Sequence, residues 1–430
     1  MTLLKKHPRG LVFIFFTEMW ERVGFYTLIA ILVLYMDKSL GFPDARKGDI
    51  YGLFLALCYF MPLLGGWLGD RVLGRRTTVK IGAGLMALGY VGLALSSAGR
   101  TTPFFLGLLL VGVGTGIFKV NMAVMVGNLY AGRPQLKDAA FNIFYMGVNL
   151  GAMIAPLGAT LVSVVWGNYN ISFWICAAGL VFSLVIFQAG DKAIAPADFR
   201  GAPQEPPSVA VHAPAAAVAP AEERSRVVAL VLLYFIVIFF WTAFYQNGFA
   251  LTLFAERSTK AFSWLRPETY QFFEPAFILI LTPLLLALFA RWNARGREPS
   301  TPLKIFSGLL IMSLSMLVMV LACLAGGNKD VAVMSPLWLI GTYFLVTLAE
   351  ILISPMGQSY VSKVAPPRLA GLMMGGWFAA TAVGSYGSGL LGKSYGRFAH
   401  HQYFLLLVGL LAVSAGLILV FIKKLRRFAG

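Results

Sequence analysis

The sequence predicts an all-α integral membrane protein with twelve membrane-spanning helices in two bundles of six. Of its 430 residues, 58% are hydrophobic and only 12% are charged, whereas a soluble domain carries about 25% charged residues. The mean hydropathy is +0.77. Apolar runs of about 20 residues, the length that crosses a bilayer as a helix, recur along the whole chain. One proline- and alanine-rich segment divides these runs into two sets of six.

The positions of the apolar runs place the helices at 10–36, 48–70, 76–98, 103–128, 138–165, 170–190, 226–254, 267–292, 302–325, 335–363, 367–392 and 400–423. The segment between the sixth and seventh helices lacks the large apolar side chains that a core needs, so it is predicted to be a flexible linker. We therefore expect an N-terminal six-helix bundle over 1–190, a cytoplasmic linker over 191–225 and a C-terminal six-helix bundle over 226–430.

The distribution of basic residues predicts the topology. Of the 35 Lys and Arg residues, 23 fall in the two tails, the even-numbered loops and the helix ends that adjoin them, 10 fall in the odd-numbered loops, and Arg22 and Lys119 lie inside helices. By the positive-inside rule, both termini are cytoplasmic in a multi-pass protein of the cytoplasmic (inner) membrane. The net charge of +17 is then mainly a topology signal toward the lipid bilayer, and we expect no nucleic-acid partner. The three cysteines lie in apolar runs and are expected to be packing residues without a metal.

The loop after the second helix, "GGWLGDRVLGRR", carries a Gly-punctuated basic turn, and a similar turn follows the eighth helix. Two parallel six-helix repeats with such a loop resemble the major facilitator superfamily. The matching residues are Gly66, Asp70, Arg71, Gly74, Arg75 and Arg76. We expect Asp70, Arg71 and Arg75 to form a gating latch at helix ends that breaks during each cycle. The alternative is a basic loop that only sets topology.

Ionisable residues at bilayer depth are rare and usually mark a pathway. Here they are Glu18, Glu21, Arg22, Lys119, Glu274 and Glu350. The first three share one helix face through i, i+3, i+4 spacing. Four carboxylates exceed two cations, and surplus buried acid is either protonated or paired transiently. This pattern predicts proton coupling by carboxylates, since the four histidines fall in predicted tails or loops or at the very start of the last predicted helix. The alternative is an ion pair that only fixes helix packing.

Four stretches resemble the proton-coupled oligopeptide transporter family over nearly the whole chain. They are "EMWERVGFY", "GTGIFKVNMAVMVGNLY", "FNIFYMGVNLGAMIAPL" and "LAEILISPMGQSYVSKVAPPRLAGLMMGGWFAATAVG". The resemblance implies that Glu18, Glu21, Arg22 and Lys119 couple protons, and that Glu350 faces Lys119 and binds a peptide amino terminus. It also implies that Arg22 and Lys119 attract the substrate carboxylate. The other residues expected at the substrate site are Tyr26, Tyr59, Asn149, Tyr245, Ser354 and Trp377.

The chain departs from this family at several positions. Ile29 replaces a second arginine of the first helix, and Tyr245 replaces the glutamate of the seventh helix that usually pairs with it. Losing both partners avoids a stranded charge, but the outer gate must then close through other contacts. Glu274 replaces an asparagine, and we expect it to take part in proton coupling and substrate binding. Its alternative is a periplasmic-end acid exposed to water.

We therefore expect a proton-coupled symporter that imports di- or tripeptides or peptide-like zwitterions. It would act as a monomer, with protons as the coupling ion and no other cofactor. One alternative is a proton-coupled carrier or exporter of a non-peptide metabolite. A non-transporting membrane receptor fits less well, because it would usually carry a folded soluble output domain. An enzyme is not expected, since the sequence shows no nucleophile–base or metal constellation.

Overall fold

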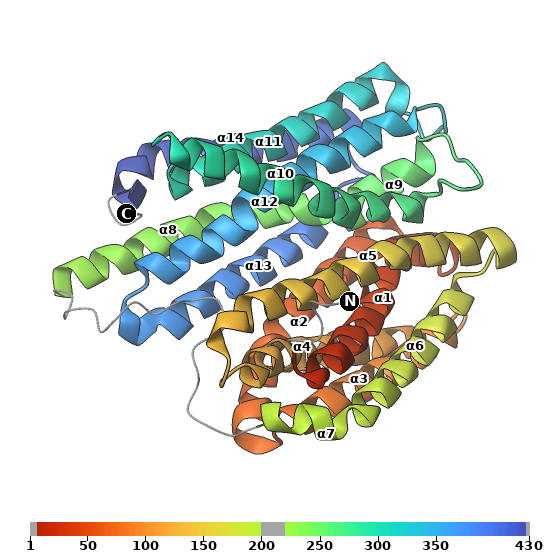
Figure 1. Cartoon of the computed structure of the whole chain (residues 1–430). Helices are drawn as coiled ribbons and strands as arrows, with labels where there is room; N and C mark the ends of the chain where they lie inside the picture. Colours follow the sequence, from red (N-terminus) through yellow and green to blue (C-terminus); the bar gives the residue numbers. More distant parts are fainter. Residues whose placement is uncertain (1–6, 199–219, 427–430) are drawn as a thin grey trace. The chain divides into compact units, whose positions relative to one another are not determined.

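The computed structural model describes residues 7–198 and 220–426, which form helices joined by short connections (Figure 1). The helices before residue 199 are α1 (Arg9–Lys38), α2 (Asp44–Trp67), α3 (Arg75–Ala94), α4 (Thr102–Leu129), α5 (Lys137–Trp166), α6 (Tyr169–Ala189) and α7 (Asp191–Ile194). Those after residue 219 are α8 (Pro220–Phe244), α9 (Ala250–Arg257), α10 (Phe273–Ala294), α11 (Thr301–Ala322), α12 (Pro336–Val364), α13 (Ala370–Gly392) and α14 (His400–Arg426). Single turns of 3-10 or π helix are η2 (Leu68–Val72), η3 (Pro134–Leu136), η4 (Ala195–Ala197), η5 (Tyr245–Gly248), η6 (Pro267–Phe272), η7 (Cys323–Gly327) and η8 (Pro367–Leu369).

The predicted membrane fold is confirmed. Eleven helical segments in the described ranges are long and apolar enough to cross a membrane, and the mean hydropathy of their most apolar stretches runs from 1.3 to 2.9. The twelfth predicted span is α13, a helix of 23 residues whose many glycine, serine and threonine residues lower its hydropathy. The chain is thus a multi-pass membrane protein, and its described residues form twelve long helices.

The described chain folds into two compact units. Unit 1 comprises the described parts of 1–42 and 54–208, and unit 2 comprises 43–53 and the described parts of 209–430. In unit 1, α1 packs against α5 and α6, and α3 packs against α4 and α6 (Figure 1). In unit 2, α11 packs against α12 and α14, and α8 packs against α13 and α14.

Glycine brings α5 close to the charged part of α1. A Cβ atom added at Gly151 would lie 2.5 Å from the carbonyl oxygen of Met19 and 2.8 Å from Cβ of Arg22. Real Cβ atoms do not approach other atoms this closely, so a larger residue at 151 would push the two helices apart. The small residue therefore allows α5 to cover the buried charges of α1.

The predicted seventh helix, 226–254, was wrong in two respects. It begins at Pro220, because Glu222 and Arg226 form an i, i+4 ion pair of 2.8 Å that extends the first turns. It is also interrupted by the 3-10 turn η5, which separates α8 from α9. The reason is the Asn247–Gly248 dipeptide, a strong turn signal that interrupts regular helix.

The start of α2 groups with unit 2, although α2 is the second helix of the chain. Gly48 and Gly52 lie against α13, where a Cβ at Gly48 would lie 2.5 Å from the carbonyl oxygen of Gly389. A Cβ at Gly389 would in turn lie 2.4 Å from Cα of Gly52. Close backbone packing through small residues is typical of membrane helix pairs.

The chain after α6 continues as α7 and η4. These residues fall within the segment 191–225 that was predicted to be linker. Asn128 Nδ2 of α4 donates a 2.9 Å hydrogen bond to the carbonyl oxygen of Ala197, which holds η4 against unit 1. Residues 199–219, most of the predicted linker, lie outside the described residues.

Candidate functional site

Three buried charged side chains lie together on α1. Arg22 Nε is 3.1 Å from Glu18 Oε1 and 2.5 Å from Glu21 Oε2. Each of the three is at most 1% exposed. Burying an isolated charge is costly, whereas a paired charge regains much of that cost from its partner. The helix therefore tolerates these residues because the guanidinium is held between two carboxylates.

Lys119 of α4 adds a second cation to this group. Its ammonium lies within electrostatic range of Glu18 and Glu21, and Nζ is 5.7 Å from the centroid of the Tyr59 ring. Lys119 is exposed, unlike the three residues of α1. We call Glu18, Glu21, Arg22 and Lys119 the unit 1 charge cluster. It contains two carboxylates and two cations, so its formal charges balance.

A tight crossing of α2 and α4 positions Lys119 beside α2. A Cβ at Gly65 would lie 2.4 Å from Cα of Ile117, and a Cβ at Gly116 would lie 2.2 Å from Cβ of Met61. Asn121 Nδ2 then donates 2.8 Å hydrogen bonds to the carbonyl oxygens of both Gly65 and Ile117. This bifurcated bond ties the two helices together two residues after the lysine.

Part of the unit 1 charge cluster is unsatisfied in the described structure. Glu18 Oε2, Glu21 Oε1 and Arg22 Nη2 are buried without a hydrogen-bond partner among the described residues. Buried polar atoms nearly always have partners, and the exceptions often mark functional positions. Two acceptors and one donor of the unit 1 charge cluster are therefore left without a partner among the described residues.

The other predicted residues of unit 1 make local contacts. Tyr26 and Tyr59 are half-buried and lie within electrostatic range of Arg22. Asn149 is 4% exposed, and its Nδ2 donates a 2.9 Å hydrogen bond to the carbonyl oxygen of Tyr145 in its own helix. The structure therefore brings the two tyrosines to the unit 1 charge cluster, while the Asn149 amide is engaged within α5.

In unit 2, Glu274 lies in the first turn of α10 and is half-buried. Its Oε2 accepts a 2.9 Å hydrogen bond from Asn247 Nδ2 in η5. Glu350 of α12 is also half-buried and lies close enough to Glu274 for their charges to repel. We call Glu274 and Glu350 the unit 2 carboxylate pair. The structure thus joins a residue that the family pattern contains to one that departs from it.

Asn247 is held firmly by its backbone. Its carbonyl oxygen accepts hydrogen bonds from Gln271 Nε2 at 2.7 Å, Thr252 Oγ1 at 3.0 Å and the Tyr343 hydroxyl at 3.0 Å. Three donors on one carbonyl fix the 3-10 turn, so the Asn247 amide is presented to Glu274 in one orientation. Sequence reasoning missed this residue, although the Asn-Gly signal marked the turn.

The remaining predicted residues of unit 2 make contacts of their own. Ser354 is half-buried, four residues after Glu350 on α12. Tyr245 is 7% exposed, and its ring stacks on Trp241 with centroids 5.7 Å apart. Trp377 is 1% exposed and packs on Gly357, where an added Cβ would lie 2.0 Å from Cη2 of the indole.

The loop before α3 contains the predicted latch residues. Arg75 Nη1 forms an ion pair with Asp70 Oδ1. Arg71 is exposed, and the described part of the chain provides no ion pair for it. Asp198 Oδ1 accepts hydrogen bonds from the backbone amides of Arg75 at 2.8 Å and Arg76 at 3.2 Å. A carboxylate at a helix N-terminus is favourable, so Asp198 caps α3 from a distant part of the sequence.

Asp191 of α7 also binds this loop, since it pairs with Arg76 Nη2 and lies 3.1 Å from Lys80 Nζ. The hydrogen bond from Arg76 and the bond from Lys80 hold the pKa of Asp191 below its usual value. A carboxylate whose pKa is lower in the folded state stabilises the fold above its unfolded pKa, about 3.9, and loses this effect as the pH falls further.

We therefore expect Asp191→Asn to lower the thermal unfolding midpoint at pH 7 by about 1–2 °C, a shift typical of an exposed ion pair. The difference from wild type should close when the pH falls below about 4. Scanning fluorimetry in detergent across this range measures it, with Arg76→Gln as the partner variant. Additive effects of the two substitutions would show that the pair does not stabilise the fold.

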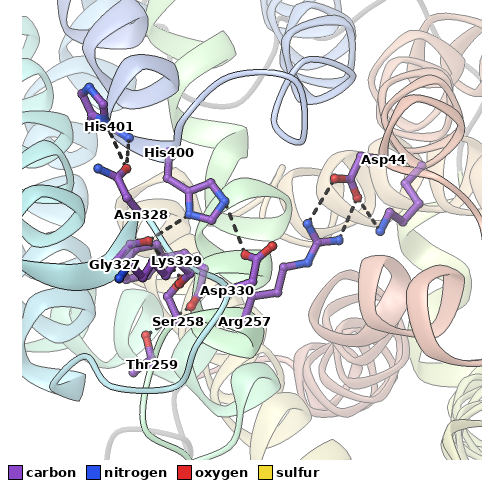
Figure 2. A network of polar contacts seen from close by, with 12 residues as sticks. Asp44, Arg257, Ser258, Thr259, Gly327, Asn328, Lys329, Asp330, His400 and His401 are labelled. Atoms are coloured by element: carbon purple, nitrogen blue, oxygen red, sulfur yellow. Dashed lines mark hydrogen bonds and ion pairs between the residues drawn. The ribbon is translucent and has the colours of Figure 1, made fainter.

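A polar network in unit 2 joins the start of α2 to α9 (Figure 2). Arg257 Nη2 and Nη1 donate to Asp44 Oδ1 and Oδ2 at 2.8 and 3.1 Å. Lys47 Nζ lies 2.6 Å from Asp44 Oδ1. The carboxylate is thus bound by two cations at once. No sequence pattern connects Asp44 with Arg257, because the two residues lie 213 positions apart.

The same figure shows a second branch around the start of α14. His400 Nδ1 lies 2.9 Å from the carbonyl oxygen of Gly327, and Nε2 lies 3.5 Å from Asp330 Oδ1. His401 and Asn328 bond beside it, with the His401 backbone amide donating to Asn328 Oδ1 at 2.9 Å. The histidines therefore fasten α14 to the connection between η7 and α12.

The twelve-helix architecture and the ionisable residues within its helices define a multi-pass membrane transporter of the major facilitator fold. The chain belongs to the POT family, whose model matches residues 76–202 and 204–406.

Individual relatives agree with this assignment. The di-/tripeptide transporter of Lactococcus lactis subsp. cremoris is 30% identical over 489 residues, covering 97% of this chain and 95% of the relative. A crystal structure of peptide transporter POT in complex with sulfate matches with a TM-score of 0.88 at 29% identity, covering 99% of this chain and 96% of that one. A POT family transporter in complex with 5-aminolevulinic acid matches with a TM-score of 0.85 at 26% identity, covering 97% of each chain.

Proposed function

We propose that this protein is a proton-coupled symporter that imports di- and tripeptides or peptide-like zwitterions by alternating access. The observation that carries the proposal is the unit 1 charge cluster, in which one buried arginine is held by two carboxylates. Membership of the POT family and the named activity of the Lactococcus relative support the peptide substrate.

The cluster suggests how a proton and a substrate are linked. Protonation of Glu21 removes a negative charge beside Arg22 and weakens the hold on the guanidinium. Arg22 Nη2, which lacks a hydrogen-bond partner among the described residues, is then free to bind a substrate carboxylate together with Lys119. Because the linkage is reciprocal, substrate binding at Arg22 also favours protonation of Glu21. Tyr26 and Tyr59 flank this position.

For the substrate amine, we propose the unit 2 carboxylate pair as the acceptor, with Glu350 as the principal carboxylate. Ser354, Tyr245 and Trp377 would supply contacts to the peptide, and Asp70, Arg71 and Arg75 would act as the cytoplasmic latch. The protein would work as a monomer in the cytoplasmic membrane with both termini cytoplasmic. Protons would be its coupling ion, and it would perform no enzymatic reaction.

The alternative is a proton-coupled carrier or exporter of a non-peptide metabolite. Two observations favour it. First, Ile29 and Tyr245 replace the arginine and the glutamate that peptide-transporting members usually carry at these positions. Second, a POT family transporter of similar structure is known in complex with 5-aminolevulinic acid. That ligand carries one amine and one carboxyl group, so the same charged residues would suit it.

Uptake in proteoliposomes separates these possibilities. With an imposed inward proton gradient, we expect radiolabelled Ala-Ala to accumulate above its external concentration and unlabelled dipeptides to compete for entry. The control is the same preparation with the gradient collapsed by a protonophore. Accumulation that ignores the gradient would contradict proton coupling, and an absence of peptide uptake or competition would favour a non-peptide substrate.

A further inference from the structure

We infer that the unit 2 carboxylate pair makes this transporter selective for substrates that carry an extra positive charge, such as dipeptides with a lysine or arginine side chain. This inference rests on the proposed peptide transport and adds the substrate class. It assigns Glu274, which occupies a position where asparagine is common in the family, as the residue that determines the preference.

Buried charge is balanced in unit 1 but not in unit 2. The unit 1 charge cluster holds two carboxylates and two cations, so it is neutral by itself. The unit 2 carboxylate pair differs. Among the described residues of unit 2, the interactions of Glu274 and Glu350 involve the Asn247 amide, the Tyr343 phenol and each other, and none involves a lysine, arginine or histidine. The excess of acid within the helices therefore falls entirely in unit 2.

The unit 2 carboxylate pair lies in a defined polar site. The Asn247 side chain, 5% exposed, donates to Glu274, and the three hydrogen bonds on its carbonyl oxygen keep it in place. Glu274 itself cannot withdraw from this partner without leaving a buried amide unsatisfied. The carboxylate is thus fixed near Glu350 despite their mutual repulsion.

Unsatisfied polar atoms lie at the unit 2 carboxylate pair. Within the described ranges, Glu350 Oε2 is buried without a hydrogen-bond partner, and so is the hydroxyl of Tyr270, a residue only 2% exposed. The Tyr343 phenol lies within electrostatic range of both Tyr270 and Glu274. A free carboxylate oxygen and a free phenol beside a fixed carboxylate are suited to bind an ammonium or guanidinium group, which donates several hydrogen bonds.

The two glutamates of the pair require two positive charges to be balanced. A neutral dipeptide brings one ammonium group and one carboxylate, so its ammonium balances only one of the two glutamates. The second glutamate then needs a proton, which must be bound and released with every turnover. A lysine or arginine side chain supplies the second cation directly. Cationic peptides should therefore bind more tightly than neutral ones of equal size.

Competition against labelled Ala-Ala in wild-type proteoliposomes tests this at pH 7. We expect Lys-Ala or Ala-Lys to inhibit at a concentration about tenfold lower than unlabelled Ala-Ala, as for a gained charge-assisted hydrogen bond. Glu-Ala should inhibit more weakly than Ala-Ala. Equal inhibition by the cationic and neutral peptides would overturn the inference, while measurable Ala-Ala uptake would leave the proposed function intact.

Glu274→Gln assigns the preference to this residue. In wild type, the inhibitory concentration of the neutral peptide is expected to be about ten times that of the cationic peptide. In this variant we expect that ratio to fall to about twofold or less. The matched control is Glu298→Gln, the same substitution at a glutamate that pairs with Lys304 outside the pair. If uptake by Glu274→Gln is too slow to measure, peptide-induced thermal stabilisation of the purified variant gives the same ratio. An unchanged ratio in either measurement would overturn the assignment.

Discussion

Glu21→Gln is expected to abolish uptake driven by a proton gradient and to leave substrate counterflow intact. Glutamine has the shape of a protonated glutamate but cannot release the proton, so the cycle loses its coupling step. Counterflow exchanges substrate for substrate and does not require deprotonation. Driven uptake of labelled Ala-Ala should fall to background, while exchange into peptide-loaded liposomes should proceed at a rate close to wild type.

The geometry indicates that this variant still folds. Arg22 lies 3.1 Å from Glu18 in the wild-type structure, so removing the charge at position 21 leaves the guanidinium with a buried counter-charge. Glu222→Gln is a suitable control, because that glutamate lies in the first turn of α8 and forms an ion pair with Arg226 of the same helix. Normal driven uptake by Glu21→Gln would contradict the role of this residue and would move the coupling to Glu18 or Glu274.

The unit 1 charge cluster was predictable from the sequence, because helical spacing alone places Glu18, Glu21 and Arg22 on one face of a helix that is too apolar to expose them. The twelve spans followed from apolar run length in the same way. Both inferences use local patterns, in which residues a few positions apart decide the outcome. Local patterns do not depend on how distant segments pack.

Contacts between distant segments were beyond this kind of reasoning. Asp198 caps α3 from 123 residues away, and nothing in its surroundings marks it as a cap. Asn247 was visible as half of an Asn-Gly turn signal, yet the partner that its amide binds, Glu274, depends on how η5 meets α10. The departure at Glu274 could be noticed in the sequence, but its proximity to Glu350 required the fold.

The contact between the start of α2 and α9 offers an answer to a problem that the sequence raised. Ile29 and Tyr245 cannot form the ion pair expected between the first and seventh helices. In the structure, Asp44 and Arg257 form an ion pair between the second and seventh helices instead (Figure 2). A second ion pair, Lys393 to Asp49 at 2.9 Å, joins the same stretch of α2 to the end of α13. We propose that these two ion pairs close the outer gate, on the side predicted to face away from the cytoplasm.

Arg257→Gln and Asp44→Asn should therefore each reduce driven uptake roughly fivefold to tenfold, since a loss of about 1–1.4 kcal/mol changes a two-state equilibrium by that factor. Each partner is at most 20% exposed, so solvent screens the pair less than a surface pair. The double variant should be no worse than either single variant, because the interaction is already lost after the first substitution.

A double-mutant cycle on thermal stability measures the interaction directly, and Arg226 with Glu222 provides the matched reference. That pair is also 2.8 Å long, but its glutamate is 42% exposed and both residues lie on one helix. We expect a coupling of about 1 kcal/mol or more for Asp44 with Arg257 and about 0.3–0.5 kcal/mol for the helical pair. Equal couplings would mean that the contact between α2 and α9 is held by the Gly48, Gly52 and Gly389 packing, and that the ion pair does not close this side.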